Sequence, residues 1–131
     1  RLGISGQIRI VDTIPSSRVP EYLNCMDCLV LPSRTTKKWK EQFGRVLIEA
    51  MACEVPVIGS DSGEIPDVIG ESGLVFREGD VDDLASKLEV LINNKDVRVK
   101  LAEKGRQRVL NNFTQEKVAK ETYKIYQKMM S

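Results

Sequence analysis

The sequence predicts an α/β domain in which a parallel sheet is covered by helices on both faces. Short apolar runs alternate with segments of helical character, and the last third of the chain is helical throughout. Strands buried on both faces of a parallel sheet are apolar along their whole length, as these runs are. At 131 residues the chain has the size of one domain.

Turn-forming residues separate the expected strands. A short helix is expected to begin at Ser16 or Ser17 and to reach about Asn24. Pro66 fits the first turn of another short helix. Ligands of parallel sheets bind beyond the carboxyl ends of the strands, so the segments after the strands are where a site is expected. About four strands are predicted, at residues 8–11, 28–31, 55–59 and 73–76.

The last third of the chain contains three expected helices. Asp80, Asp96 and Thr114 stand before them and have side chains that accept hydrogen bonds from the free N–H groups at a helix start. Apolar residues then recur at helical spacing. In the last helix the expected apolar face consists of Val118, Ile125, Tyr126 and Met129.

Composition excludes several function classes. Twenty basic and nineteen acidic residues leave a net charge of +1, which gives no electrostatic case for nucleic-acid binding. The sequence has no histidine, so it contains no histidine general base, no Ser-His-Asp triad and no histidine zinc ligand. No apolar run approaches the roughly 20 residues that span a membrane.

The three cysteines suggest a reducing compartment. Cys25 and Cys28 have CxxC spacing, but Cys53 is the only other cysteine, and a structural zinc site needs four ligands. We therefore favour reduced packing residues over a redox or metal site. An odd cysteine count without a signal peptide is typical of the cytoplasm.

Residues 41–52 form the stretch on which the functional prediction depends. It is predicted to be a helix that opens on a glycine-containing turn and is otherwise apolar around a single carboxylate, Glu49. A carboxylate in such a helix needs a polar partner or a cleft. Glu41 is eight positions earlier, which on one helix is about 80° around and about 12 Å along the axis. Both carboxylates are therefore expected on one wall.

The start of this helix is a candidate phosphate site. Free amides and the positive end of the helix dipole attract anions, and Gly44 lets an anion approach the backbone. Carboxylates beside it suit the hydroxyls of a phosphorylated sugar. The alternative, a core helix with one solvated and one ion-paired glutamate, stays open. The small residues 60–63 form a second, weaker candidate.

The segment from Arg34 to Lys40 is basic and contains the only tryptophan, Trp39. It is expected to be a surface loop. A solvated loop is the favoured interpretation, and a lid over a donor or an acceptor is the alternative.

Several motifs resemble one family, and they occur in the same order as in that family. Glu41 and Glu49 stand in an E-x7-E pattern, and residues 27–33 are similar to a D-x-x-x-x-P-S strand. Residues 56–58 and 63–67 look like P-V-I and G-x-I-P-E segments, and residues 73–80 resemble a G-L-L-V…G-D stretch. The chain resembles the C-terminal, nucleotide-sugar-binding domain of retaining GT-B glycosyltransferases of the group 1, or family 4, class. The resemblance covers nearly the whole chain and implies a Rossmann-like sheet.

The resemblance implies roles for individual residues. Glu41 would be the catalytic residue, beside the donor sugar and its transition state. Glu49 would hold the ribose hydroxyls of the nucleotide, and backbone amides near Phe43 and Gly44 would contact the donor sugar or its phosphates. Arg45, Ser33 and Val11 are the remaining donor-binding candidates, with Val11 beside the base. No metal or cofactor is implied, because the substrate itself is a UDP-, GDP- or ADP-linked sugar.

The resemblance also implies that the chain is one part of a two-domain enzyme. The family's Arg/Lys pair for the diphosphate and its acceptor-binding N-terminal domain have no counterpart here, so residues 1–131 are expected to be a single partial domain, truncated at its N-terminus and inactive alone. Glu54 replaces a glycine, and Asp67 replaces a glutamate, of the family pattern.

The expected function of the full-length protein is the transfer of a sugar, of the hexosyltransferase type and with retention of configuration, in polysaccharide biosynthesis. A non-catalytic nucleotide-sugar-binding or degenerate GT-B domain is the alternative, and an epimerase or phosphorylase is a third option. The acceptor would be a sugar or a lipid-linked glycan held by the missing domain. The apolar face of the last helix is expected to be exposed and to allow self-association. The location would be the cytoplasm or the inner face of the membrane.

Overall fold

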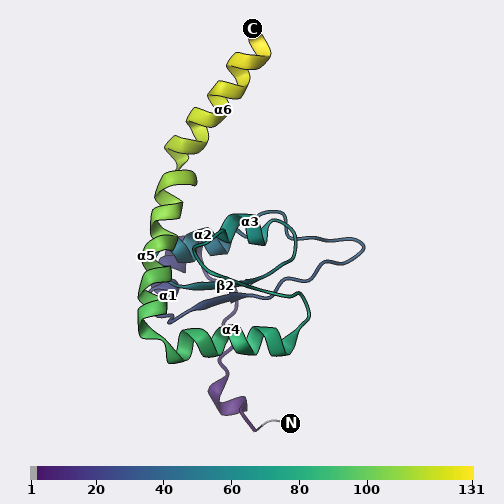
Figure 1. Ribbon diagram of the computed structural model, residues 1–131, viewed down its shortest axis with the longest axis vertical. Coiled ribbons are helices and arrows are strands. Elements are labelled where there is room, and N and C mark those ends of the chain that lie inside the picture. Colours follow the sequence, from purple (N-terminus) through teal and green to yellow (C-terminus); the bar gives the residue numbers. More distant parts are fainter. Residues whose placement is uncertain (1–2) are drawn as a thin grey trace.

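The computed structural model describes residues 3–131 and contains a three-stranded parallel sheet with helices on both faces (Figure 1). The strands are β1 (Leu29–Leu31), β2 (Val57–Ser60) and β3 (Leu74–Phe76), in the order β1-β2-β3. Ile58 of the central strand lies opposite Val30 on one side and Leu74 on the other. The predicted fold class is confirmed.

Within residues 3–131, six α-helices and two short 3-10 helices surround or extend from the sheet. In Figure 1, α2 and α3 cover one face, α4 covers the other, α5 runs along the side and α6 projects away from the body. The helices are α1 (Val19–Leu23), α2 (Arg45–Ala52), α3 (Ile65–Ile69), α4 (Val81–Asn93), α5 (Lys95–Asn112) and α6 (Gln115–Met130), with 3-10 helices at Ser5–Gln7 and Ser16–Arg18.

The core consists of two clusters, one on each face of the sheet. Val57 belongs to the cluster with α2 and α3, which includes Leu47 and Ile65, whereas its neighbour Ile58 belongs to the cluster with Phe76 and Leu91. Both β2 side chains are fully buried because adjacent residues of a strand point to opposite faces. This explains the continuous apolar pattern in the sequence.

The strand predicted at residues 8–11 is wrong. The segment is not part of the sheet, and its side chains are exposed: Ile8 by 60%, Ile10 by 88% and Val11 by 49%. A strand requires a neighbouring backbone to complete its hydrogen bonds. In Figure 1 the N-terminal segment leaves the body of the molecule on the α4 side, away from such a neighbour.

Two of the four predicted helix caps are confirmed, and two are wrong. The Asp80 carboxylate accepts from the Asp83 N–H at 2.9 Å, and the Thr114 hydroxyl accepts from the Lys117 N–H at 3.2 Å. Asp96, however, lies inside α5, because the extended backbone ends at Asn94. Ser16 and Ser17 form a 3-10 turn instead of capping α1.

The apolar face of α6 is exposed, as expected. Ile125, Tyr126 and Met129 are exposed by 58–76%, and the helix buries none of its residues. Across residues 3–131, every helix is too short or too polar to cross a membrane.

Candidate functional site

Gly44 immediately precedes α2. Its φ of +67° is left-handed, and a side-chain carbon there would lie 3.0 Å from the Leu47 side chain and 3.3 Å from that of Leu31. The backbone angle therefore favours glycine, and the tight packing against the two leucine side chains adds to this preference. Because glycine has no side chain, the first N–H groups of α2 have no side-chain cap from this residue.

Glu41 lies ahead of α2, not along it, so the predicted helical spacing between Glu41 and Glu49 is wrong. The reason is the left-handed backbone at Gly44, which starts the helix after this residue. The Glu41 side chain instead reaches the mouth of the helix. Its Oε1 accepts from the Gly44 N–H at 3.0 Å, and its Oε2 accepts from the Ser33 hydroxyl at 3.2 Å.

The turn before α3 holds the backbone of Glu41. The Glu64 N–H donates to the Glu41 carbonyl at 3.3 Å. Gly63 has a φ of +60°, and a side-chain carbon on it would lie 1.9 Å from the same carbonyl oxygen. Only glycine fits such an approach, so the segments after β1 and β2 together position Glu41.

Glu49 lies one turn into α2 and has a polar partner, which is one of the two alternatives that the sequence leaves open for it. Its carboxylate contacts the Arg45 guanidinium at 3.1 Å, and the two side chains are exposed by 37% and 84%. A pair this exposed contributes little stability, and arginine N-terminal to glutamate is the less favourable order on a helix. The carboxylate is therefore accessible to a ligand.

The loops after all three strands are joined by hydrogen bonds at the carboxyl edge of the sheet. The Ser60 hydroxyl donates to the Ser33 carbonyl at 2.6 Å, and the hydroxyls of Thr35 and Ser62 lie 2.8 Å apart. The Thr35 N–H donates to the Glu78 carboxylate at 2.6 Å. Ser62 belongs to the weaker candidate site at residues 60–63, but sequence reasoning missed its contact with Thr35 and the bond from Thr35 to Glu78, since no local pattern joins residues 27 and 43 positions apart.

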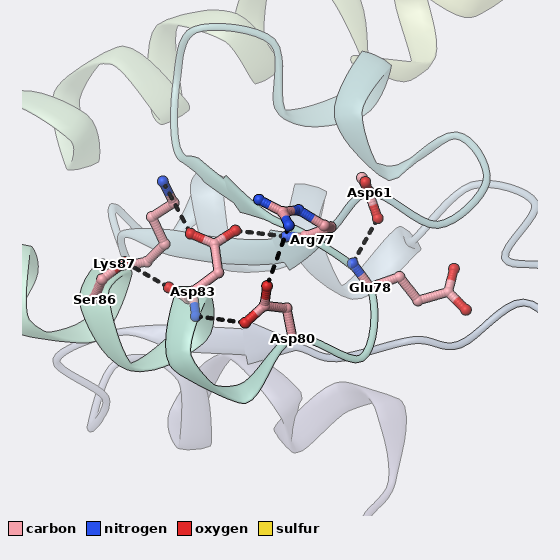
Figure 2. Close-up of polar contacts among 7 residues, drawn as sticks. All are labelled: Asp61, Arg77, Glu78, Asp80, Asp83, Ser86 and Lys87. Atoms are coloured by element: carbon pink, nitrogen blue, oxygen red, sulfur yellow. Dashed lines mark hydrogen bonds and ion pairs between the residues drawn. The ribbon is translucent and has the colours of Figure 1, made fainter.

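Acidic side chains from outside the turn between β3 and α4 hold the backbone amides of that turn (Figure 2). Asp61 accepts from the Glu78 N–H, and Asp83 accepts from the Arg77 N–H, both at 2.7 Å. The Arg77 N–H, with Lys87 contributing, lowers the pKa of the Asp83 carboxyl below its usual value. These carboxylates stabilise the turn.

A polar hollow lies beside the mouth of α2. It is lined by Lys40, Glu41, Gln42 and Glu64. Phe43, at the edge of this region, is 47% exposed and packs edge to face on Phe113, with ring centroids 6.0 Å apart. The arrangement offers carboxylates that accept from hydroxyls, next to amides and a helix dipole that attract an anion.

The structure brings some of the predicted residues together and leaves others apart. Ser33, Glu41 and Gly44 are joined by hydrogen bonds, and Arg45 pairs with Glu49. Val11 lies in the exposed N-terminal segment.

The CxxC cysteines are not paired with each other. Cys25 is exposed and Cys28 half-buried, with both thiols free. Burial, with Asp27 contributing, raises the pKa of Cys28 and keeps its thiol protonated.

Comparison with known proteins identifies relatives of the chain. The family model described as glycosyl transferases group 1 matches residues 1–108. The chain is 37% identical over 107 residues to the capsular polysaccharide biosynthesis glycosyltransferase CapM of Staphylococcus aureus, covering 80% of this chain and 27% of that protein. It is 36% identical over 110 residues to the N-acetyl-alpha-D-glucosaminyl L-malate synthase of Bacillus anthracis, covering 82% and 28%.

Solved structures share the fold. A sucrose-phosphate synthase from Thermosynechococcus elongatus superposes with a TM-score of 0.84 at 28% identity, over 97% of this chain and 31% of that one. Anabaena HepE in complex with UDP superposes with a TM-score of 0.75 at 20% identity, over 83% and 29%. The chain thus spans about 30% of the length of these proteins.

Proposed function

The chain belongs to the group 1 family of glycosyl transferases, and on this premise we propose that the full-length protein transfers a sugar from a nucleotide-sugar to an acceptor with retention of configuration. Residues 1–131 would bind the donor. The observation that carries this proposal is the Glu41 carboxylate, which Ser33 and Gly44 hold at the uncapped start of α2.

The start of α2 would bind the leaving group. As the bond between the sugar and the diphosphate breaks, negative charge develops on the phosphate oxygens. Helix amides and the helix dipole stabilise such charge without reorganising, because the fold already fixes their positions. The close packing around Gly44 keeps the backbone in place.

The two carboxylates would bind the two ends of the donor. Glu41 lies at the helix mouth and would accept hydrogen bonds from the donor sugar and stabilise positive charge at its reacting carbon. Glu49 would accept from the ribose hydroxyls in place of its exposed partner Arg45. We propose that no metal or other cofactor takes part, since the amides of α2 supply the electrostatic stabilisation.

Ligand-detected NMR with UDP-, GDP- and ADP-sugars tests donor binding by the full-length protein. We expect one nucleotide to bind selectively, and Glu49→Ala to weaken it at least tenfold. Glu103→Ala, which removes an exposed carboxylate from α5, is the matched control and should have no effect.

A transfer assay tests the role of Glu41. Glu41→Gln should keep donor affinity within a few-fold and lower transfer by about a hundredfold or more, because the lost charge acts mainly in the transition state. Binding of none of the three nucleotide-sugars would contradict the proposal. Binding without transfer would favour a non-catalytic nucleotide-sugar-binding module.

The acceptor, a sugar or lipid-linked glycan, would be held by a further domain of the full-length protein. The exposed apolar face of α6 would allow isolated residues 1–131 to self-associate. A sedimentation measurement that gives only monomer at high concentration would contradict this self-association. We propose a cytoplasmic location, free or at the inner face of the membrane.

A further inference from the structure

The loop of residues 34–40, here called the Trp39 loop, concentrates positive charge. It contains Arg34, Lys37, Lys38 and Lys40 and no acidic residue, although the chain as a whole carries only +1. The three lysines are exposed, and they take part in none of the ion pairs formed within residues 3–131. Their charge is therefore available to an anion from outside the chain.

The tip of the loop is a closed turn. The Thr36 N–H donates to the Trp39 carbonyl at 2.7 Å, and the Thr36 hydroxyl accepts from the N–H groups of Lys38 and Trp39 at 3.3 and 3.0 Å. Trp39 remains 52% exposed on this turn. In Figure 1 the loop projects from the carboxyl edge of the sheet, away from α5.

The base of the loop is attached to the candidate site. Thr35 contacts both Ser62 and Glu78, and Ser33 donates to Glu41. Lys40, at the far end of the loop, lines the same hollow as Glu41 and Glu64. The loop and the proposed catalytic carboxylate therefore form one unit.

We infer that the Trp39 loop contacts the acceptor, which the further domain holds from its other side, and selects an acceptor sugar that carries an anionic group. An indole ring offers a large, rigid surface to the C–H face of a sugar ring, and lysines pair with a carboxylate, sulfate or phosphate. Glu41 and Glu64 repel an anion, so the anionic group lies at the lysines while hydroxyls enter the hollow. This inference rests on the proposed glycosyl transfer, since it places an acceptor hydroxyl beside Glu41.

The test uses fluorine NMR of full-length protein labelled with 5-fluorotryptophan, in which Trp39→Phe identifies the Trp39 signal. The probes are a hyaluronan tetrasaccharide, which is anionic, and chitotetraose, its neutral counterpart. We expect the titration of the Trp39 shift to give a dissociation constant at least tenfold lower for the anionic probe than for the neutral one. Raised salt should weaken this binding.

A charge-matched pair of variants tests the lysines. Replacing Lys37, Lys38 and Lys40 by glutamine should weaken binding of the anionic probe at least tenfold. The control variant replaces Lys95, Lys100 and Lys104, exposed residues of α5, by glutamine and should bind the probe as the parent does. Equal binding of the two probes, no shift with either, or equal effects of the two triple variants would overturn the inference. A shift with phosphatidylglycerol vesicles but not with the tetrasaccharide would also overturn it, in favour of a membrane surface. A nucleotide-sugar titration in the same samples shows separately whether donor binding is intact.

Discussion

The helices α2 and α4 both begin at the carboxyl edge of the sheet, yet they begin in different ways. At α4, Asp80 caps the Asp83 N–H, and two further acidic residues, Asp82 and Asp83, lie in the first turn. At α2, the cap position is Gly44, no side chain caps the helix, and the first turn contains no acidic residue.

This difference shows which helix start is available to a ligand. The acidic side chains at α4 already satisfy the amides and the dipole of that helix, so its start serves stability. The first turn of α2 supplies no such groups, and the Glu41 carboxylate, which precedes the helix, accepts only from the Gly44 N–H and leaves the amides of the first turn without a side-chain cap. Four predictions separate the two roles, beginning with the largest expected effect.

Gly63→Ala should disrupt the α2 site. The new methyl group collides with the Glu41 carbonyl and is strained at a φ of +60°, so we expect a loss of about 3 kcal/mol in unfolding free energy. Gly79→Ala is the control beside α4, because its φ of +76° carries the same strain but its nearest neighbour lies at an ordinary 3.6 Å. It should cost about 1 kcal/mol. Urea unfolding measures the free energy of unfolding of both variants. Equal losses would show that the backbone moves to relieve the collision at residue 63.

Asp80→Ala should destabilise the chain by about 1 kcal/mol through loss of the α4 cap. Nucleotide-sugar affinity should not change, because this helix start is structural. Thermal unfolding and a binding titration on the same variant measure the two effects. A large loss of affinity with little loss of stability would reverse the roles assigned to α2 and α4.

Asp83→Asn should change the dependence of stability on pH. The folded-state pKa of Asp83 is lowered, so its ionised form stabilises the fold above the usual aspartate pKa of about 3.9. That contribution is lost as the pH falls through the lowered value. The variant should therefore melt below the parent at pH 7, and this difference in melting temperature should shrink as the pH falls below the usual aspartate pKa. The control is Asp82→Asn, an exposed neighbour in the same turn, which should leave the pH dependence of the melting temperature as it is in the parent.

Glu54→Gly should stabilise the far end of α2 slightly, by about 0.5 kcal/mol. Glu54 has a φ of +58°, and the N–H groups of Glu54 and Val55 donate to Met51 and Ala50 in the pattern of a helix end that favours glycine. The lost Arg106 ion pair is exposed and offsets only part of the gain. Glu54→Ala, which loses the same pair without relieving the strain, should not stabilise.

The sequence predicts the features that depend on neighbours along the chain. The apolar runs of β1, β2 and β3 and the caps Asp80 and Thr114 are of this kind. Whether residues 8–11 form a strand depends on a distant backbone. The position of Glu41 depends on one left-handed glycine, and the ties of Thr35 depend on loops that meet only in the folded chain. Asp96 is not a cap because the backbone becomes helical directly after Asn94, two residues earlier.

The ties at the carboxyl edge of the sheet also determine when the site is assembled during folding. The bonds from Thr35 to Ser62 and Glu78 join residues 27 and 43 positions apart. Contacts of such separation form late, because loop closure costs entropy before the contact forms, whereas α4, α5 and α6 contain their own bonds. In hydrogen exchange followed during refolding, we expect the helix amides to become protected from exchange first and the Thr35 N–H last. The geometry around Glu41 would then be completed only after all three strands are paired.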